Sequence, residues 1–188
     1  MIVLAAGLSR RAAPHHKLLL PAPDGSGRTV VRATAEALCA VADLADILVV
    51  TGHERTRIEA ALAGLPLRFV FAADFAHGMG HSLAAGVRSS HADTRGFLVS
   101  PADLPGLTPQ LVRRVVTNAA AAHYARHIIP TAQGRRGHPV FLAASLRARL
   151  ETLTGDVGAR ILLATPEERA RTDLIEVGDE AILCDVDV

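Results

Sequence analysis

The chain opens with an apolar run that ends in three small residues and is followed by a basic stretch. Ala5, Ala6 and Gly7 have short side chains or none, so successive backbone N–H groups can turn toward one anion. Arg11 and Lys17 follow, and their positive charges can neutralise phosphate oxygens. The small residues alone are equally typical of a tight turn. Their position between an apolar run and a lysine favours a phosphate-binding loop.

Lys17 is the one lysine of the chain, since the other 19 of its 20 basic residues are arginines. We attribute the ratio itself to a genome biased toward arginine codons. A lysine retained against that bias suggests a position where a compact ammonium works and a planar guanidinium does not.

Asp103 stands at the end of another apolar run and is followed by Leu104 and Pro105. An aspartate at the carboxyl end of a buried strand points toward the place where ligands bind in open α/β sheets. Divalent cations such as Mg²⁺ prefer carboxylate oxygens of this kind. Spacing alone favours the simpler interpretation, in which Asp103 caps a turn.

A glycine-rich segment, 75–83, precedes a predicted helix and contains Gly78 and Ser82. A helix N-terminus with free N–H groups attracts anions, and a serine hydroxyl adds a further donor. His77 and His81 have the spacing of a metal pair on a helix. We expect no such pair, because glycines at 78 and 80 disfavour helix there.

Two further residues have both a structural and a binding interpretation. Arg136 can grip a phosphate or be surface charge, and Asp156 can cap a helix or contact a ligand. His138 precedes a proline, which keeps it extended. His15 and His16 are predicted to be a solvated loop pair.

Short apolar strands alternate with amphipathic stretches along the whole chain, and the Pro/Gly-rich loop 21–28 is expected to be a mobile surface loop. This alternation predicts an α/β fold, a three-layer αβα sandwich with a mostly parallel, Rossmann-like sheet, forming one domain over residues 1–188. Strands are predicted at 1–5, 46–51, 67–72, 96–100, 128–131, 140–142, 174–177 and 182–186, and the apolar strands at 46–51 and 67–72 are expected to be buried. Helices are predicted at 29–41, 55–63, 83–89, 109–122, 144–153 and 157–164.

Composition excludes several classes of protein. Hydrophobic residues make up 49% of the 188 residues, charged residues 21%, and the formal net charge is +1. That charge gives no field to attract nucleic acid or an acidic membrane, and no apolar run approaches the ~18 residues that span a bilayer. The first residues lack the basic start of a signal peptide. Cys39 and Cys184 are typical of reduced thiols, so we expect a cytoplasmic protein.

Residues 4–19 resemble the N-terminal signature of the MobA-like nucleotidyltransferases, with Ala12 and Ala13 where that signature has Met-Gly. Four more segments resemble the family's motifs and occur in the same order. These are 78–83, the Asp-x-Pro sequence at 103–105, Gly-x-x-Gly-His-Pro at 134–139 and Gly-Asp-x-Gly-Ala-Arg at 155–160. The last of these, and Ala6 in place of glycine, are most similar to the molybdenum cofactor cytidylyltransferase branch.

The resemblance implies a role for each matching residue. Catalysis is assigned to Lys17, Arg11 and Asp103, and a metal, Mg²⁺, to Asp103 and Asp187. Acceptor binding is assigned to His138, Arg136 and Asp156. Nucleotide binding is assigned to Leu4, Ala5, Ala6, Gly7, Ser9, Lys17, Gly78 and Ser82.

The reaction implied by this resemblance is transfer of CMP from CTP to the terminal phosphate of molybdopterin or the molybdenum cofactor, with release of pyrophosphate. The partners would be CTP or another NTP, a molybdopterin-type acceptor, and a molybdoenzyme or its maturation chaperone. Three other hypotheses stay open. The first is an NAD(P)H-dependent oxidoreductase of the nicotine-blue type on the same fold. The second is a guanylyltransferase or another NTP transferase, for which a sugar phosphate or methylerythritol phosphate is also a possible acceptor, and the third is a non-catalytic carrier of the pterin cofactor.

Overall fold

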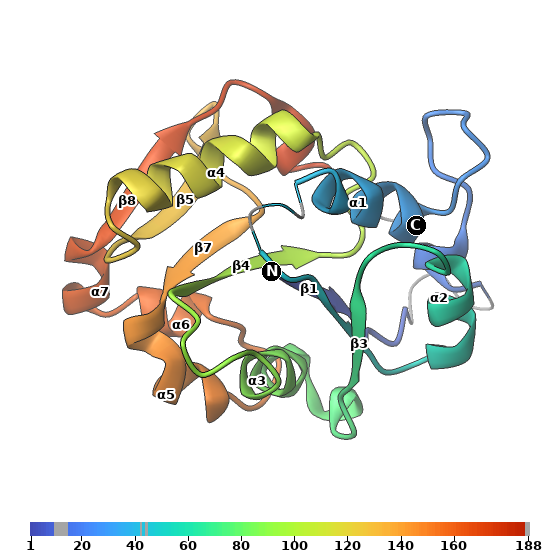
Figure 1. Ribbon diagram of the computed structural model, residues 1–188, viewed down its shortest axis with the longest axis horizontal. Helices are drawn as coiled ribbons and strands as arrows, with labels where there is room; N and C mark the ends of the chain where they lie inside the picture. The colour runs from blue at the N-terminus through green and yellow to red at the C-terminus, as the bar shows by residue number, and fades with distance from the viewer. Residues whose placement is uncertain (10–14, 42, 44, 187–188) are drawn as a thin grey trace.

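The computed structural model describes residues 1–9, 15–41, 43 and 45–186 (Figure 1). Within this part of the chain, eight strands form one sheet. The strands are β1 (Ile2–Ala5), β2 (Leu48–Thr51), β3 (Arg68–Phe71), β4 (Gly96–Pro101), β5 (His127–Ala132), β6 (Arg135–Arg136), β7 (Val140–Ala143) and β8 (Thr172–Glu176). Arg11 and Asp187, two of the predicted site residues, lie outside the described residues.

The strand order is β3-β2-β1-β4-β7-β5-β6, and β8 pairs with β5. The pairs β1–β2, β2–β3, β1–β4 and β5–β8 are parallel. Strand β7 runs antiparallel to β4 and β5, and β6 runs antiparallel to β5. The short connection from β5 through β6 to β7 explains the reversal, because a parallel return needs a longer crossover. The predicted three-layer, mostly parallel α/β fold is confirmed.

Helices cover both faces of the sheet (Figure 1). Helices α1, α2 and α4 supply residues to one apolar core, and α3, α5 and α6 supply residues to the other. The bounds are α1 (Val30–Cys39), α2 (Arg55–Ala61), α3 (Met79–Arg88), α4 (Pro109–Ala121), α5 (Arg147–Glu151), α6 (Arg160–Leu163) and α7 (Pro166–Ala170). Short 3-10 turns are η2 (Lys17–Leu19), η4 (Phe75–His77), η5 (Ala144–Leu146) and η6 (Glu180–Ile182). Among the described residues, none of the helices has the length and apolar character needed to cross a bilayer.

Three expectations about elements were wrong. Strand β3 was expected to be buried, but it is the edge strand beside β2 and is largely exposed. Helix α3 begins at Met79, well before the predicted start. The predicted closing strand at 182–186 is absent, and a 3-10 turn and irregular chain occupy the described residues there.

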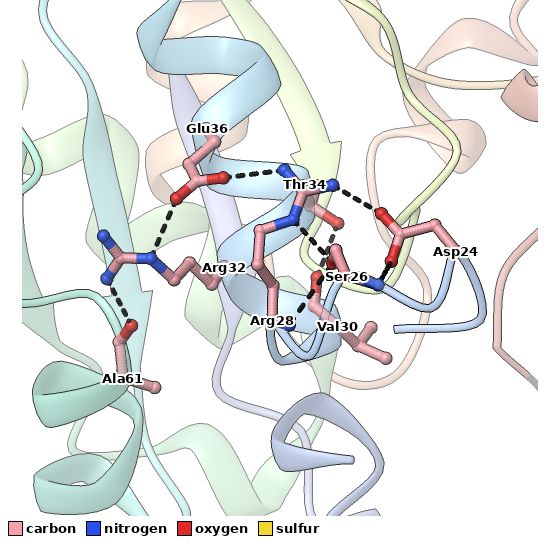
Figure 2. A network of polar contacts seen from close by, with 8 residues as sticks. All are labelled: Asp24, Ser26, Arg28, Val30, Arg32, Thr34, Glu36 and Ala61. Carbon is pink, nitrogen blue, oxygen red and sulfur yellow. Dashed lines mark hydrogen bonds and ion pairs between the residues drawn. The ribbon is translucent and has the colours of Figure 1, made fainter. Parts of the chain in front are cut away.

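The Pro/Gly-rich loop before α1 is a surface loop held by polar contacts (Figure 2). Arg28 contacts Asp24, donates to Ser26 Oγ at 2.9 Å and donates to Glu36 on α1 at 2.8 Å. Hydrogen bonds from Ser26 and Arg28 lower the pKa of Asp24 to about 2. The expectation of a mobile loop took no account of this network.

Strands β1 and β4 are hydrogen-bonded neighbours, although β2 and β3 lie between them in the chain. From β1 the chain continues to β2 and β3, which lie toward one edge of the sheet, and from β4 it continues to the strands on the other side of β1. Such a reversal leaves a crevice outside the carboxyl ends of the two strands, where ligands of open α/β sheets bind.

Candidate active site

A cavity of about 440 Å³ lies outside the carboxyl ends of β1 and β4. It brings together most of the residues that the sequence predicted for the nucleotide and the metal. Its described lining consists of Leu4, Ala6, Gly7, Leu8, Ser9, His16, Lys17, Leu18, Phe75, Ala76, Gly78, Met79, Ser82, Pro101, Asp103 and Asp156. Ala5 is fully buried within β1 and is not part of this wall.

Lys17 and Asp103 form an ion pair inside this cavity, through Nζ and Oδ2. The side chains are 25% and 12% exposed, so the pair is only partly screened by water. The second carboxylate oxygen, Oδ1 of Asp103, is buried and has no hydrogen-bond partner among the residues that the structure describes. A carboxylate oxygen in that state has an unused capacity for a cation or a donor.

Two consecutive residues, His16 and Lys17, make contacts with the start of the β1–η2 connection. The Lys17 N–H donates to Ser9 Oγ at 2.8 Å. His16 Nε2 lies 3.1 Å from the carbonyl oxygen of Gly7. Ser9 has a φ of 50°, in the left-handed region, which turns the chain after Gly7. These contacts hold residues 7–9 beside the Lys17 ammonium.

His16 was expected to be solvated, and that prediction was wrong. His15 is exposed, but His16 is 5% exposed and its ring lies 5.7 Å from the ring of His53. His53 follows β2, and its N–H donates to the Ala6 carbonyl at 3.4 Å. No spacing or composition signal marks this contact, because it joins the ends of two strands that are distant in the chain.

The N-terminus of α3 forms another wall of the cavity. A Cβ on Gly80 would lie 2.7 Å from the Thr154 carbonyl oxygen, so only glycine permits this packing. The Gly80 N–H donates to the Gly155 carbonyl at 2.8 Å and is therefore not free for an anion. The argument against helix holds for Gly78, which precedes the helix with a φ of 122°. It was wrong for Gly80, because close approach of segment 154–156 stabilises the helix start. The same approach brings Asp156 to the cavity.

The structure places one of the three predicted acceptor residues in the described lining of the cavity. Asp156 lines the cavity, whereas Arg136 is exposed on β6 and, like His138, is outside the described lining. His138 comes two residues before Val140, which pairs with Val99 of β4, so it lies near the end of that strand. Although part of His138 is exposed, desolvation lowers its pKa, and the charges of Asp103 and Asp185 oppose this shift.

The donor set fits a divalent cation that arrives with phosphate. Among the described residues no group of three or more potential ligands exists, and the cavity offers Asp103 with one unused oxygen. Mg²⁺ is commonly held by one or two carboxylates together with substrate phosphates. Within the described lining, Lys17 is the one cation against Asp103 and Asp156. A triphosphate therefore needs additional positive charge to enter.

Comparison with known proteins agrees with this geometry. A nucleotidyl transferase of Methanothermobacter thermautotrophicus has a similar structure, with a TM-score of 0.78 and 29% identity over 98% of this chain and 89% of that chain. Rv0371c of Mycobacterium tuberculosis in complex with manganese has a TM-score of 0.70 and 25% identity over 94% and 85% of the two chains. These similarities, with a cavity at the β1–β4 switch point, define the fold class as a Rossmann-like nucleotidyltransferase.

The family model of the MobA-like NTP transferase domain matches residues 1–172, and the chain belongs to this family. Among curated proteins, nicotine blue oxidoreductase of Paenarthrobacter nicotinovorans is 34% identical over 99% of this chain and 90% of its own length. The family and the solved structures support a nucleotidyltransferase, and the manganese complex is consistent with a divalent metal.

Proposed function

We propose that the protein transfers CMP from CTP to the terminal phosphate of molybdopterin or its molybdenum form and releases pyrophosphate. The observation that carries this proposal is the Lys17–Asp103 pair, which faces a cavity walled by loop backbone at the sheet's switch point. A cation and a carboxylate with a free oxygen are the groups that a metal-assisted reaction between two phosphates requires.

The chemistry needs positioning more than proton transfer. A phosphate oxygen of the acceptor attacks the α-phosphorus of CTP and forms a new P–O bond. The bond from the α-phosphorus to the bridging oxygen breaks, and pyrophosphate leaves with the electron pair. Because the nucleophile is already an anion, no general base is needed, and the barrier is largely charge repulsion.

In this proposal Lys17 leaves Asp103 when the triphosphate enters and places its ammonium on the phosphate oxygens. Asp103 would be the residue that holds Mg²⁺ together with the phosphates, and the metal, when bound, would supply Lewis-acid neutralisation of the reacting oxygens. The backbone of residues 6–9 surrounds the nucleotide, with Gly78 and Ser82 on the opposite wall. Arg11 and Asp187 are assigned by the family motif alone.

The acceptor is proposed to enter from the side of Asp156 and His138. Asp156 reaches the cavity from segment 154–156, and His138 lies near the end of β4. Desolvation lowers the pKa of His138, and Asp103 is close enough for its charge to oppose that lowering. Arg136 would contact the acceptor phosphate only if the acceptor extends beyond the cavity. The product would pass to a molybdoenzyme or its maturation chaperone in the cytoplasm.

A second candidate is an NAD(P)H-dependent oxidoreductase. The observation that favours it is the 34% identity with nicotine blue oxidoreductase over nearly the whole chain. The same cavity would then hold the diphosphate of the dinucleotide, and Lys17 would neutralise it. Hydride transfer requires no free carboxylate oxygen for a metal, so Asp103 distinguishes the two candidates.

The two candidates are separated by a paired assay. Pyrophosphate release is measured with CTP, Mg²⁺ and molybdopterin, and absorbance at the NADPH band is followed with NADPH and nicotine blue. We expect pyrophosphate release that is lost in Asp103→Asn. NADPH oxidation without pyrophosphate release, unchanged in Asp103→Asn, would replace the transferase by the reductase. Substituting GTP, ATP and UTP for CTP tests the nucleotide assignment, which depends on Ala6.

A further inference from the structure

One buried histidine of the cavity wall has no role in the reaction proposed above. His16 is 5% exposed, and its Nε2 lies 3.1 Å from the Gly7 carbonyl oxygen. Because a carbonyl can only accept, Nε2 carries the proton in this contact. Nδ1 is buried and has no partner in the part of the chain that the structure describes. A packing role alone would be filled by an apolar side chain without this unsatisfied nitrogen.

The surroundings keep the ring neutral and in place. Desolvation lowers the pKa of His16, and the hydrogen bond to the Gly7 carbonyl opposes this in part. Among the nearby charges, His53 and Arg57 lower the pKa further and Glu54 raises it. The His53 ring stacks on the His16 ring at an interplanar angle of 29°. A neutral Nε2–H ring is the state that donates to Gly7 without placing a charge in the core.

The contact lies where the loop backbone must be fixed. His16 holds residue 7 while the next residue, Lys17, holds Ser9 through its N–H at 2.8 Å. An ideal Cβ built on Gly7 would meet nothing within 4 Å, so the backbone there is open to the cavity. Two adjacent residues therefore fix both ends of the accessible backbone of residues 7–9, and this segment is the proposed phosphate-facing part of the loop.

We propose that His16 is a positioning residue: its Nε2–H holds the Gly7 carbonyl so that the loop is already shaped for a triphosphate before the nucleotide arrives. The inference rests on the proposed nucleotide site. His16 does not touch the reacting atoms, and it acts through Gly7. A preformed loop lowers the ordering cost of binding, so the residue affects affinity more than the chemical step.

Two isosteric substitutions separate this role from general packing. Glutamine places an amide N–H near the position of Nε2 and can still donate to Gly7, whereas asparagine is shorter and cannot reach it. We expect His16→Asn to weaken CTP binding in the presence of Mg²⁺ by about tenfold and to raise KM far more than it changes kcat. His16→Gln should retain most of the wild-type affinity. His123→Asn on the surface is the matched control.

A readout without ligand completes the test. Hydrogen exchange of the amides at 7–9 in the nucleotide-free protein should accelerate in His16→Asn and stay close to wild type in His16→Gln. Equal exchange and equal CTP affinity in wild type, His16→Asn and His16→Gln would overturn the inference. If the wild type binds no nucleoside triphosphate, the proposed function fails. In that case the exchange data still decide whether His16 orders the loop.

Discussion

Lys17 and Asp103 are 86 positions apart in the chain, yet their side chains form one ion pair. They meet because each follows one of two adjacent parallel strands, β1 and β4. The pair satisfies both charges while the cavity holds no ligand. In the proposed reaction the pair opens, because the ammonium moves from Asp103 to the phosphate oxygens.

The first prediction concerns the ammonium. Lys17→Ala should lower turnover by two to three orders of magnitude, roughly the effect of removing one group that stabilises transition-state charge. Lys17→Arg should also lose most activity, because a guanidinium is larger and does not reproduce a point charge on one oxygen. Pyrophosphate release measures both variants, and Arg169→Ala, which removes an exposed positive charge, should leave it unchanged. Full turnover in Lys17→Ala would refute the role given to Lys17.

The second prediction concerns the metal. The described lining of the cavity carries one positive and two negative side chains, Lys17 against Asp103 and Asp156, so a bare triphosphate is repelled. Chelation with EDTA should therefore weaken CTP binding by at least tenfold, an effect of about 1.4 kcal/mol. Isothermal titration of wild type with and without Mg²⁺ measures this. Equal affinity in EDTA would show that other cations of the chain suffice.

Hydrophobic periodicity predicted most helices and the central strands. It did not predict which strand lies at the sheet edge or where two backbone segments pack closely. The strands β1, β2 and β4 are continuous apolar runs and were predicted within a few residues. Strand β3 looked the same in sequence, but its place at the sheet edge depends on strand order, which a local pattern does not contain. Helix α3 was predicted late because propensity opposes glycine, whereas tertiary contact with segment 154–156 requires it.

That close approach gives a prediction for α3. Gly80→Ala raises helix propensity by about 1 kcal/mol, yet the new Cβ would lie 2.7 Å from the Thr154 oxygen and 2.9 Å from the Gly155 oxygen. We expect net destabilisation of about 1–3 kcal/mol, because backbone must move. Gly158→Ala is the control, since its Cβ would meet the Met79 methyl group at 3.3 Å. Denaturant unfolding compares the two, and a stabilised Gly80→Ala would contradict the packing argument.

Helix α7 is joined to the sheet by a buried polar network. His127 is fully buried, its Nδ1 accepts from the Ala143 N–H at 3.1 Å, and its Nε2 lies 3.1 Å from Glu168 Oε2. The other carboxylate oxygen of Glu168 accepts from Arg149 at 2.8 Å. The two contacts fix the His127 tautomer, with the proton on Nε2.

Removal of Glu168 should therefore be costly. Glu168→Ala leaves the buried Nε2–H of His127 without an acceptor, which costs about 1–3 kcal/mol, and we expect Tm to fall by several degrees. Glu167→Ala, an exposed neighbour on the same helix, should change Tm by less than a degree or so. An unchanged Tm in Glu168→Ala would mean that water replaces the carboxylate.

For the molecule as a whole, the alternation of strands and helices along the chain predicted the layers, and the motifs predicted which residues lie together at the carboxyl ends of the strands. Most predicted nucleotide residues line one cavity, because parallel strands bring their carboxyl ends to one edge. The burial of His16 and the position of Arg136 outside the described cavity lining were not predictable, since both depend on how loops from different strands pack. Local spacing describes single loops and not the contacts between them.

The pH dependence of stability is a property of the whole fold, and burial sets its sign. Desolvation lowers the pKa of His16 below its ordinary 6.5. Above about pH 6.5 the ring is neutral in the folded and unfolded states, so it makes no difference to stability. As pH falls below 6.5, the unfolded chain takes up a proton that the folded protein resists, and the free energy of unfolding decreases. His138, whose pKa is also lowered by desolvation, adds a contribution of the same sign.

We therefore expect the free energy of unfolding to fall as the pH drops below about 6.5, with a slope of at most about 1.4 kcal/mol per pH unit for each of His16 and His138. Carboxylates whose pKa is lowered by arginine, such as Asp173 beside Arg126, lose their contribution in a separate window below about pH 4. Urea unfolding across this range measures both. His16→Gln should flatten the upper window and leave the lower one, and the exposed control His123→Asn should keep the wild-type slope. An upper window unaffected by His16→Gln would mean that protonation of His16 does not limit stability, and the neutral ring assigned to the loop contact would have to be given up.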